Sequence, residues 1–200
     1  MSLSRRDFFK RGAALGGGIA VGIHLTGCGE EAAYPGAKPG ELRPNAFLQV
    51  RPNGDVVFQL PRAEMGQGVY TGLTTLAAEE LNMDAADIVV EQAYYHPEFR
   101  DPEFQMMMTG GSVSLRNNYE PVRQAAANLR EWMCQAAARQ WGASGDLRVE
   151  GGAVINADGQ RLAFAELIET ARSIPTPEDA ALKPAAEFSQ IGREGVRLDA

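Results

Sequence analysis

The amino-acid sequence predicts an α+β fold in which hairpins and a mixed sheet are packed by helices. Three observations carry this prediction. Short apolar runs stand beside turn signals at 47–60 and again at 147–160. Apolar residues recur at helical spacing in two longer segments, 69–81 and 115–141. One further strand-like run, 88–94, lies between those helices, so strands are joined by crossovers as well as by hairpins.

Strands are expected where β-branched and aromatic runs lie beside turn residues. The pair Asn53-Gly54 separates the runs 47–50 and 56–60. An Asn-Gly pair between two apolar runs is a strong hairpin signal. A further strand is expected at 88–94, and a second hairpin at 147–155 with a turn at 157–160.

Helices are expected where apolar residues recur every three or four positions. In 69–81, Leu73 and Leu76 lie at this spacing, and Glu79 and Glu80 fall on the other side. The segment therefore predicts a helix packed on one face. A longer helix is expected over about 115–141, with Pro121 starting or kinking its main segment, and a short one over 164–171.

Residues 1–28 resemble a twin-arginine export signal. Arg5 and Arg6 precede an apolar run at 12–23 that is too short to span a bilayer. The four residues that end at Cys28, Leu-Thr-Gly-Cys, resemble a lipobox in which the cysteine is lipidated. The sequence thus predicts export of a folded, cofactor-loaded protein to the periplasm, tethered to a membrane through the lipid. The alternatives are a disordered basic N-terminus and, for the cysteine, an ordinary cleavage site.

The rest of the chain is expected to form one domain behind a tether. Residues 29–45 are rich in Pro and Gly and show no apolar period, which is typical of a linker. The predicted domain covers 46–185. Residues 188–200 have little to pack against and are expected to be extended or mobile.

Charge and cysteine content exclude several classes of function. Without residues 1–27 the chain has 25 acidic and 15 basic side chains and shows no cluster of Lys or Arg, so nucleic-acid binding is disfavoured. Beyond the leader only Cys134 remains. A disulfide framework and a cysteine-held zinc or iron–sulfur site are therefore excluded for this chain.

Two Gly-rich segments that precede predicted helices are the candidate binding residues. Gly66 and Gly68 flank Gln67, whose amide offers a donor and an acceptor to a heterocycle edge. The second segment, Thr-Gly-Gly-Ser-Val-Ser at 109–114, joins flexible amides and hydroxyls in a way that suits phosphate. Neither has Walker or Rossmann spacing. Either segment alone is also explained as a turn and a helix cap.

At these residues the chain resembles a known family. The run 64–72, the Thr-Gly-Gly-Ser segment and the helix that begins near Tyr119 are similar to the molybdopterin-binding large subunit of the xanthine dehydrogenase family. The similarity is greatest to its exported isoquinoline 1-oxidoreductase beta-subunit type. The resemblance covers nearly the whole chain.

The resemblance implies a fold, a chemistry and a set of partners. It implies a molybdenum-cofactor-binding domain of the aldehyde oxidase type and hydroxylation of N-heterocycles or aldehydes, with water as the oxygen source. The implied cofactor is molybdopterin in its cytosine dinucleotide form. The implied partners are an iron–sulfur small subunit and a cytochrome acceptor. The implied cofactor contacts are Gly66, Gln67, Gly68, Gly111, Ser112, Val113 and Ser114.

The chain also departs from the family, because family subunits are several times longer. Residues 186–200 resemble a linker to a next domain, so we expect a partial domain from a truncated or split gene. The glutamate base of the family has no counterpart here; Glu64, Glu79 and Glu80 do not match it, and no catalytic or metal-ligating residue is assigned. The alternatives are an exported binding lipoprotein without catalysis and an inactive fragment.

Overall fold

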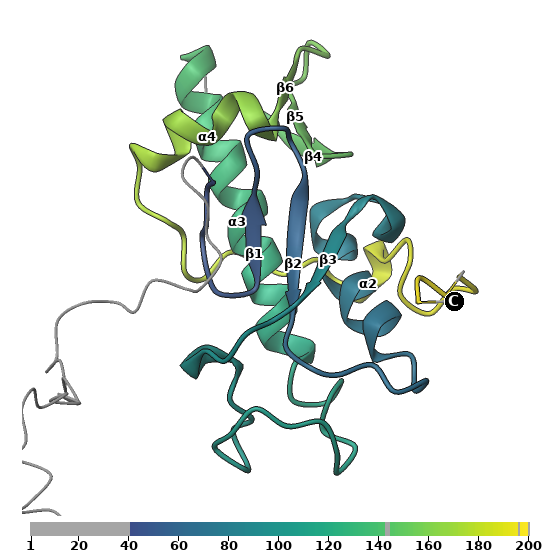
Figure 1. Ribbon diagram of the computed structural model, residues 1–200. Helices are drawn as coiled ribbons and strands as arrows, with labels where there is room; N and C mark the ends of the chain where they lie inside the picture. The colour runs from purple at the N-terminus through teal and green to yellow at the C-terminus, as the bar shows by residue number, and fades with distance from the viewer. Residues whose placement is uncertain (1–40, 143–144, 196, 200) are drawn as a thin grey trace, which may run out of the picture. The chain divides into compact units, whose positions relative to one another are not determined.

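The predicted α+β fold is confirmed. A computed structural model describes residues 41–142, 145–195 and 197–199 of the chain, and these contain two small sheets and three α-helices (Figure 1). The predicted signal segment, with Arg5, Arg6 and Cys28, lies outside the described residues, as does most of the predicted tether.

The first sheet holds the centre of the domain. Its strands are β1 (Leu48–Val50), β2 (Val56–Leu60) and β3 (Val89–Gln92), in the order β1-β2-β3. β1 and β2 form the predicted antiparallel hairpin, while β2 and β3 run parallel with Val57 opposite Val89. β3 is shorter than the predicted strand at 88–94. Every residue of β1 and β2 is buried, so this hairpin is covered on both faces.

Three helices cover the sheet: α2 (Val69–Leu81), α3 (Tyr119–Trp141) and α4 (Phe164–Arg172). The prediction that the second helix begins near residue 115 is wrong, because the preceding residues form turns that end at Asn118. Pro121 lies in the first turn of α3. Backbone N–H groups in this turn have no acceptor within the helix, so the N–H that proline lacks costs no hydrogen bond. In the described segments, no helix is both long and apolar enough to cross a membrane.

The second sheet is an antiparallel meander of β4 (Arg148–Glu150), β5 (Ala153–Ile155) and β6 (Arg161–Ala163). Gly151 and Gly152 close the predicted hairpin with φ values of 54° and 71°. Both torsions lie where glycine carries no steric penalty, as a tight hairpin requires. The predicted turn at 157–160 leads to β6, a strand too short to show in the apolar pattern. Three short 3-10 helices complete the fold at Ala85–Asp87, Pro97–Phe99 and Ala185–Glu187.

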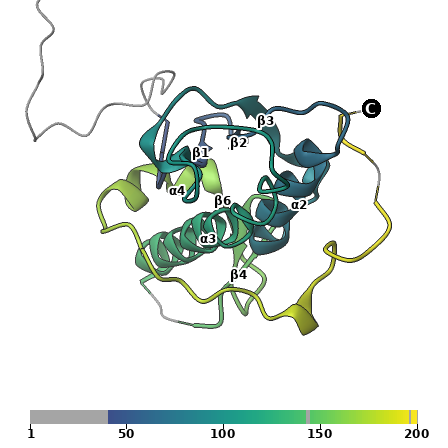
Figure 2. The same cartoon turned by 90° about the horizontal axis from the view of Figure 1, so that it is seen from below.

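The core lies where α2 and α3 pack side by side against the first sheet (Figure 2). Phe58 from β2, Leu73 from α2, Leu129 and Met133 from α3 and Phe164 from α4 are all fully buried. Removing each such side chain from water contributes about 1.5–3 kcal/mol. Contacts among these side chains hold the helices and the first sheet in one packed unit.

Glu79 and Glu80 of α2 are fully buried, contrary to the expectation that they lie on a solvated helix face. The Glu80 carboxylate accepts from Arg123 at 2.7 Å and from Arg130 at 2.6 Å, and both arginines belong to α3. Glu79 pairs with Lys183 at 2.7 Å. The prediction that this helix is packed on one face is therefore wrong for its C-terminal half, because basic residues from distant segments cover the side that carries the two carboxylates.

The segment 178–191, here called the C-terminal strap, is fastened along both helices. The amides of Ser189, Gln190 and Ile191 donate to the Glu79 carboxylate at 2.7–3.0 Å. The Arg130 guanidinium of α3 donates to the Ala181 carbonyl oxygen at 2.5 Å. The expectation that residues 188–200 have little to pack against is therefore wrong, because a buried carboxylate needs donors and the strap supplies them.

We expect Glu79→Gln to destabilise the protein at neutral pH by about 3 kcal/mol, because Lys183 then loses its buried counter-charge. Burial by itself raises the pKa of Glu79, but Lys183 and the strap amides outweigh it and lower the pKa to about 2. The carboxylate therefore stabilises the fold fully above about pH 4.5 and progressively less as the pH falls towards 2.

Urea unfolding at about pH 7, 4.5 and 3 measures the difference in free energy of unfolding between the wild type and Glu79→Gln. It should be largest at pH 7 and shrink at pH 3. The exposed Glu194→Gln is the matched control and should leave stability unchanged at each pH. A Glu79→Gln deficit that stays constant with pH would contradict the assignment.

Candidate cofactor-binding site

Two loops leave the first sheet at the same edge. Because β2 and β3 are parallel, their carboxyl ends point the same way, and the segments that follow them emerge together (Figure 1). The first loop, 61–68, joins β2 to α2, and the second loop, 93–118, joins β3 to α3. Both Gly-rich segments predicted from the sequence lie in these loops.

The first loop is shaped by local hydrogen bonds. Gly66 and Gly68 have φ values of 93° and 81°, a region that favours glycine. The Glu64 carboxylate accepts from three amides around them. The Gln67 side chain accepts from the Met65 amide at 2.5 Å and donates to the Ala63 carbonyl oxygen at 2.8 Å. These bonds hold the loop in shape although Ala63, Met65 and Gln67 are exposed.

The second loop is anchored to the first by a buried ion pair. Arg62 is 1% exposed and lies 3.4 Å from the carboxylate of Asp101, which is completely buried. Asp101 also accepts from the Asn117 side chain and from the amides of Glu103 and Phe104. Burial alone raises the pKa of Asp101, but these donors outweigh it and lower the pKa. The carboxylate thus stays charged and hydrogen-bonds to residues on both sides of the Gly-Gly-Ser segment.

The Gly-Gly-Ser segment has an unusual backbone. Gly111 and Ser112 have φ values of 60° and 57°, and the left-handed region strains a serine by about 1 kcal/mol. Within the part of the chain that the structure describes, neither amide donates a hydrogen bond. The Val113 side chain, by contrast, is buried and anchors the segment. Two consecutive amides remain available to an acceptor on a ligand.

The two loops meet in a pocket of about 350 Å³, here called the two-loop pocket. The Ala63 amide donates to the Thr109 hydroxyl at 2.8 Å and links the loops directly. The first turn of α2 also approaches the second loop closely, since a Cβ at Gly72 would lie 3.1 Å from Leu115. Eight residues line the pocket: Met65, Gln67, Val69, Thr109, Gly110, Ser112, Ser114 and Leu115.

The structure brings part of the predicted set together. Gln67, Ser112 and Ser114 line the two-loop pocket, although they come from segments more than 40 positions apart. The remaining predicted residues act differently: Gly66, Gly68 and Gly111 supply the positive φ values, and Val113 is buried beneath the segment. Their binding role stays a prediction.

Two residues of the candidate segments have roles that the sequence interpretation did not assign. Thr109 lines the pocket and bridges the loops, while Glu64 organises the backbone of the first loop. A hydroxyl and a carboxylate beside glycine runs were the available signals. The sequence did not show which residue Thr109 contacts, because its partner Ala63 lies 46 positions away.

The lining of the two-loop pocket is uncharged and combines amide, hydroxyl and apolar groups. Such a surface suits a neutral heterocycle that carries donors and acceptors. Among the described residues, no group of three or more His, Cys, Asp or Glu side chains is placed to hold a metal ion.

The sequence matches the family described as the molybdopterin cofactor-binding domain over residues 3–195. This match confirms the resemblance inferred from the Gly-Gln-Gly and Gly-Gly-Ser segments. It spans almost the full length of the chain.

Curated relatives at about 30% identity are oxidoreductases. The chain is 30% identical to the membrane-bound aldehyde dehydrogenase [pyrroloquinoline-quinone] of Gluconacetobacter polyoxogenes, over 96% of this chain and 25% of that protein. It is 31% identical to a nicotinate dehydrogenase subunit of Pseudomonas putida, over 82% and 14%. It is 29% identical to the beta subunit of isoquinoline 1-oxidoreductase from Brevundimonas diminuta, over 88% and 22%. The chain thus spans a quarter or less of these relatives.

We expect Thr109→Val to loosen the junction between the loops, because it removes the hydroxyl that accepts from the Ala63 amide while keeping the side-chain volume. Hydrogen exchange of that amide, followed by NMR, should accelerate roughly tenfold, the effect of losing about one net hydrogen bond. Thr109→Ser keeps the hydroxyl and should exchange as the wild type does. Equal exchange in all three proteins would show that the loops meet without this bond.

Proposed function

The chain belongs to the molybdopterin cofactor-binding domain family, and on that premise we propose that the two-loop pocket holds the pterin end of a molybdenum cofactor. The observation that carries the proposal is the meeting of the two Gly-rich segments in one uncharged pocket. Gln67 would pair with the polar edge of the cofactor. The hydroxyls of Ser112 and Ser114 and the amides beside them would hold the pterin.

The chemistry of the lining fits this group. A pterin is a flat heterocycle with donors and acceptors around its edge, and the pocket offers one amide, three hydroxyls and free backbone N–H groups. Molybdenum in this cofactor is carried by the pterin, which agrees with a lining that has no metal-ligating side chains. When bound, the cofactor would supply the redox centre.

We propose the cytosine dinucleotide form of the cofactor. A pocket of about 350 Å³ lies at the small end of the range of ligand sites and accommodates only part of such a molecule. The nucleotide would then extend beyond this chain. The proposed reaction is hydroxylation of an N-heterocycle or an aldehyde, in keeping with the names of relatives that are nicotinate, isoquinoline and aldehyde oxidoreductases.

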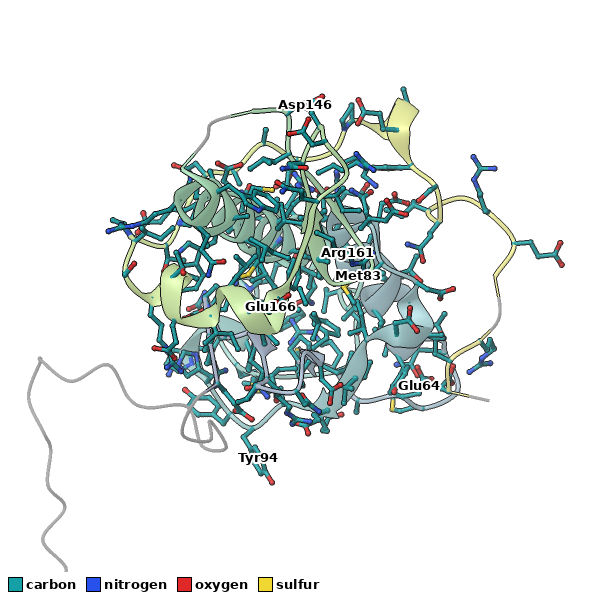
Figure 3. All side chains as sticks on the ribbon, turned by 90° about the horizontal axis from the view of Figure 1, so that it is seen from above. Glu64, Met83, Tyr94, Asp146, Arg161 and Glu166 are labelled. Atoms are coloured by element: carbon teal, nitrogen blue, oxygen red, sulfur yellow. The ribbon has the colours of Figure 1, made fainter. Side chains whose placement is uncertain are left out.

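Further polypeptide would have to cover the site, and exposed apolar side chains support this. Met65 is 70% exposed, Tyr94 is 65% exposed and projects outward in Figure 3, and Met106 is 57% exposed. All three lie on the two loops, and large apolar side chains exposed around a binding site are compatible with a covering partner. We propose the remaining large-subunit domains as the covering polypeptide, with an iron–sulfur subunit and a cytochrome acceptor completing electron transfer.

The location of the protein belongs to the same proposal. Arg5 and Arg6 would direct export of the folded, loaded protein to the periplasm, and Cys28 would carry a lipid anchor. Cytoplasmic loading suits a cofactor that is assembled there before export.

One relative is named for pyrroloquinoline quinone, which makes the identity of the cofactor the decisive measurement. The assembly that contains this chain should be purified from cells that make both cofactors, then tested for molybdenum by elemental analysis and for pterin and quinone by chromatography. Molybdenum and pterin at about one per chain would support the proposal. Bound quinone without molybdenum would overturn it.

We expect Gln67→Ala to lower the molybdenum and pterin content of this assembly roughly three- to tenfold, the effect of losing about one hydrogen bond to the ligand. Gln135→Ala removes the same side chain from an exposed position on α3 and should retain full content. Unchanged content in Gln67→Ala would remove this residue from the site.

A further inference from the structure

We propose that Glu64 is the positioning residue of the two-loop pocket: its carboxylate gathers three backbone amides and fixes the loop that presents Gln67. This inference rests on the proposed cofactor site. Glu64 itself is absent from the pocket lining. It would act through the backbone on either side of Gln67.

The contacts of Glu64 enclose the Gly-Gln-Gly segment. One carboxylate oxygen accepts from the Gly66 amide at 2.7 Å and from the Gly68 amide at 3.0 Å. The other accepts from the Tyr70 amide at 2.8 Å. Gly68 is the N-cap of α2 and Tyr70 lies in its first turn, where amides have no partner within the helix and a negative charge is favourable. A single side chain thus satisfies donors before and after Gln67.

Few other contacts hold residues 64–68 of the first loop, whereas Arg62 and Ala63 are held by the second loop. A Cβ placed on Gly66 or Gly68 would meet nothing within 4 Å. Both positions therefore require glycine for their positive φ values and not because a side chain would clash. Met65 and Gln67 are exposed. The Gln67 side chain adds two local bonds, because it accepts from the Met65 amide and donates to the Ala63 carbonyl oxygen. A ligand that recruits the Gln67 amide competes with these bonds, whereas the Glu64 bonds remain intact.

The charge of Glu64 is needed because three donors converge on it. A glutamine at this position offers one acceptor oxygen, and its amide nitrogen would face a backbone N–H. The Tyr70 amide, assisted by those of Gly68 and Gly66, lowers the pKa of Glu64 against the opposing effects of desolvation and Asp199. The carboxylate is therefore ionised at neutral pH.

Two charged residues of the C-terminal segment lie near enough to Glu64 to affect its pKa or to interact with its charge. Asp199 accepts from the Thr71 hydroxyl at 3.0 Å and forms an ion pair with Arg197. Arg197 also interacts electrostatically with Glu64. The Leu198 amide donates to the same hydroxyl at 3.0 Å. Figure 3 shows Glu64 beside this segment. Asp199 disfavours and Arg197 favours the ionised form, so a titration must separate Glu64 from this pair.

The first test uses the cofactor-free chain. In NMR spectra between about pH 7 and 2.5, the amide protons of Gly66, Gly68 and Tyr70 should shift together with one midpoint below 4.5. Glu64→Gln should abolish the shared titration and accelerate exchange of these amides about tenfold. Asp199→Asn should keep the shared titration and move its midpoint down. Amides that titrate separately, or titrate unchanged in Glu64→Gln, would overturn the inference.

The second test uses the assembly. Glu64→Gln should lower pterin and molybdenum content roughly three- to tenfold, and Glu64→Asp should recover part of it, because the shorter side chain still carries two acceptor oxygens. Glu120→Gln, an exposed glutamate in the first turn of α3, is the control. Thermal unfolding midpoints should match that control, which separates positioning from loss of fold.

The outcomes distinguish this inference from the proposed function. If Gln67→Ala lowers cofactor content and Glu64→Gln does not, the site stands and Glu64 is not its positioning residue. If wild-type assembly holds neither molybdenum nor pterin, the proposed function fails, whereas the shared titration in the cofactor-free chain is measured independently of it.

Discussion

The burial of two adjacent carboxylates on α2 is the constraint on which the rest of the structure depends. An ionised carboxylate away from water is tolerated only when donors surround it. Glu80 therefore requires Arg123 and Arg130, which fix α3 against α2. Glu79 requires Lys183 and the amides that follow it, which bring the C-terminal strap back across both helices. Opposite charges from three segments thereby set the packing of the domain.

This constraint also supports the two-loop pocket. α2 carries Glu79 near its C-terminal end and begins directly after Gly68, so a helix held at one end positions a binding loop at the other. The C-terminal segment reaches the first turn of α2 as well, through Leu198 and Thr71. A site placed on a rigid element keeps its geometry better than one on a free loop. Truncating the chain before the strap would therefore disturb a pocket that the strap does not line.

The site itself combines two levels of organisation. Parallel pairing of β2 and β3 sends two loops out at one sheet edge, which brings distant segments within reach of each other. Local chemistry then shapes each loop: Glu64 around the first, and Asp101 with its donors around the second. The result is an uncharged lining with available amides and hydroxyls, in a family whose relatives are oxidoreductases.

The sequence by itself determined the local elements, the family and the two candidate segments. Asn53-Gly54 predicted the first hairpin, apolar spacing predicted α2, and the order of the Gly-rich motifs indicated the family, because each signal is contained in a short run of residues. Tertiary structure decided that Glu79 is buried and that Thr109 reaches Ala63. Helical period shows which residues share a face, but the donors that stabilise a buried carboxylate come from segments up to 112 positions away. Only the folded chain brings those donors to the carboxylate.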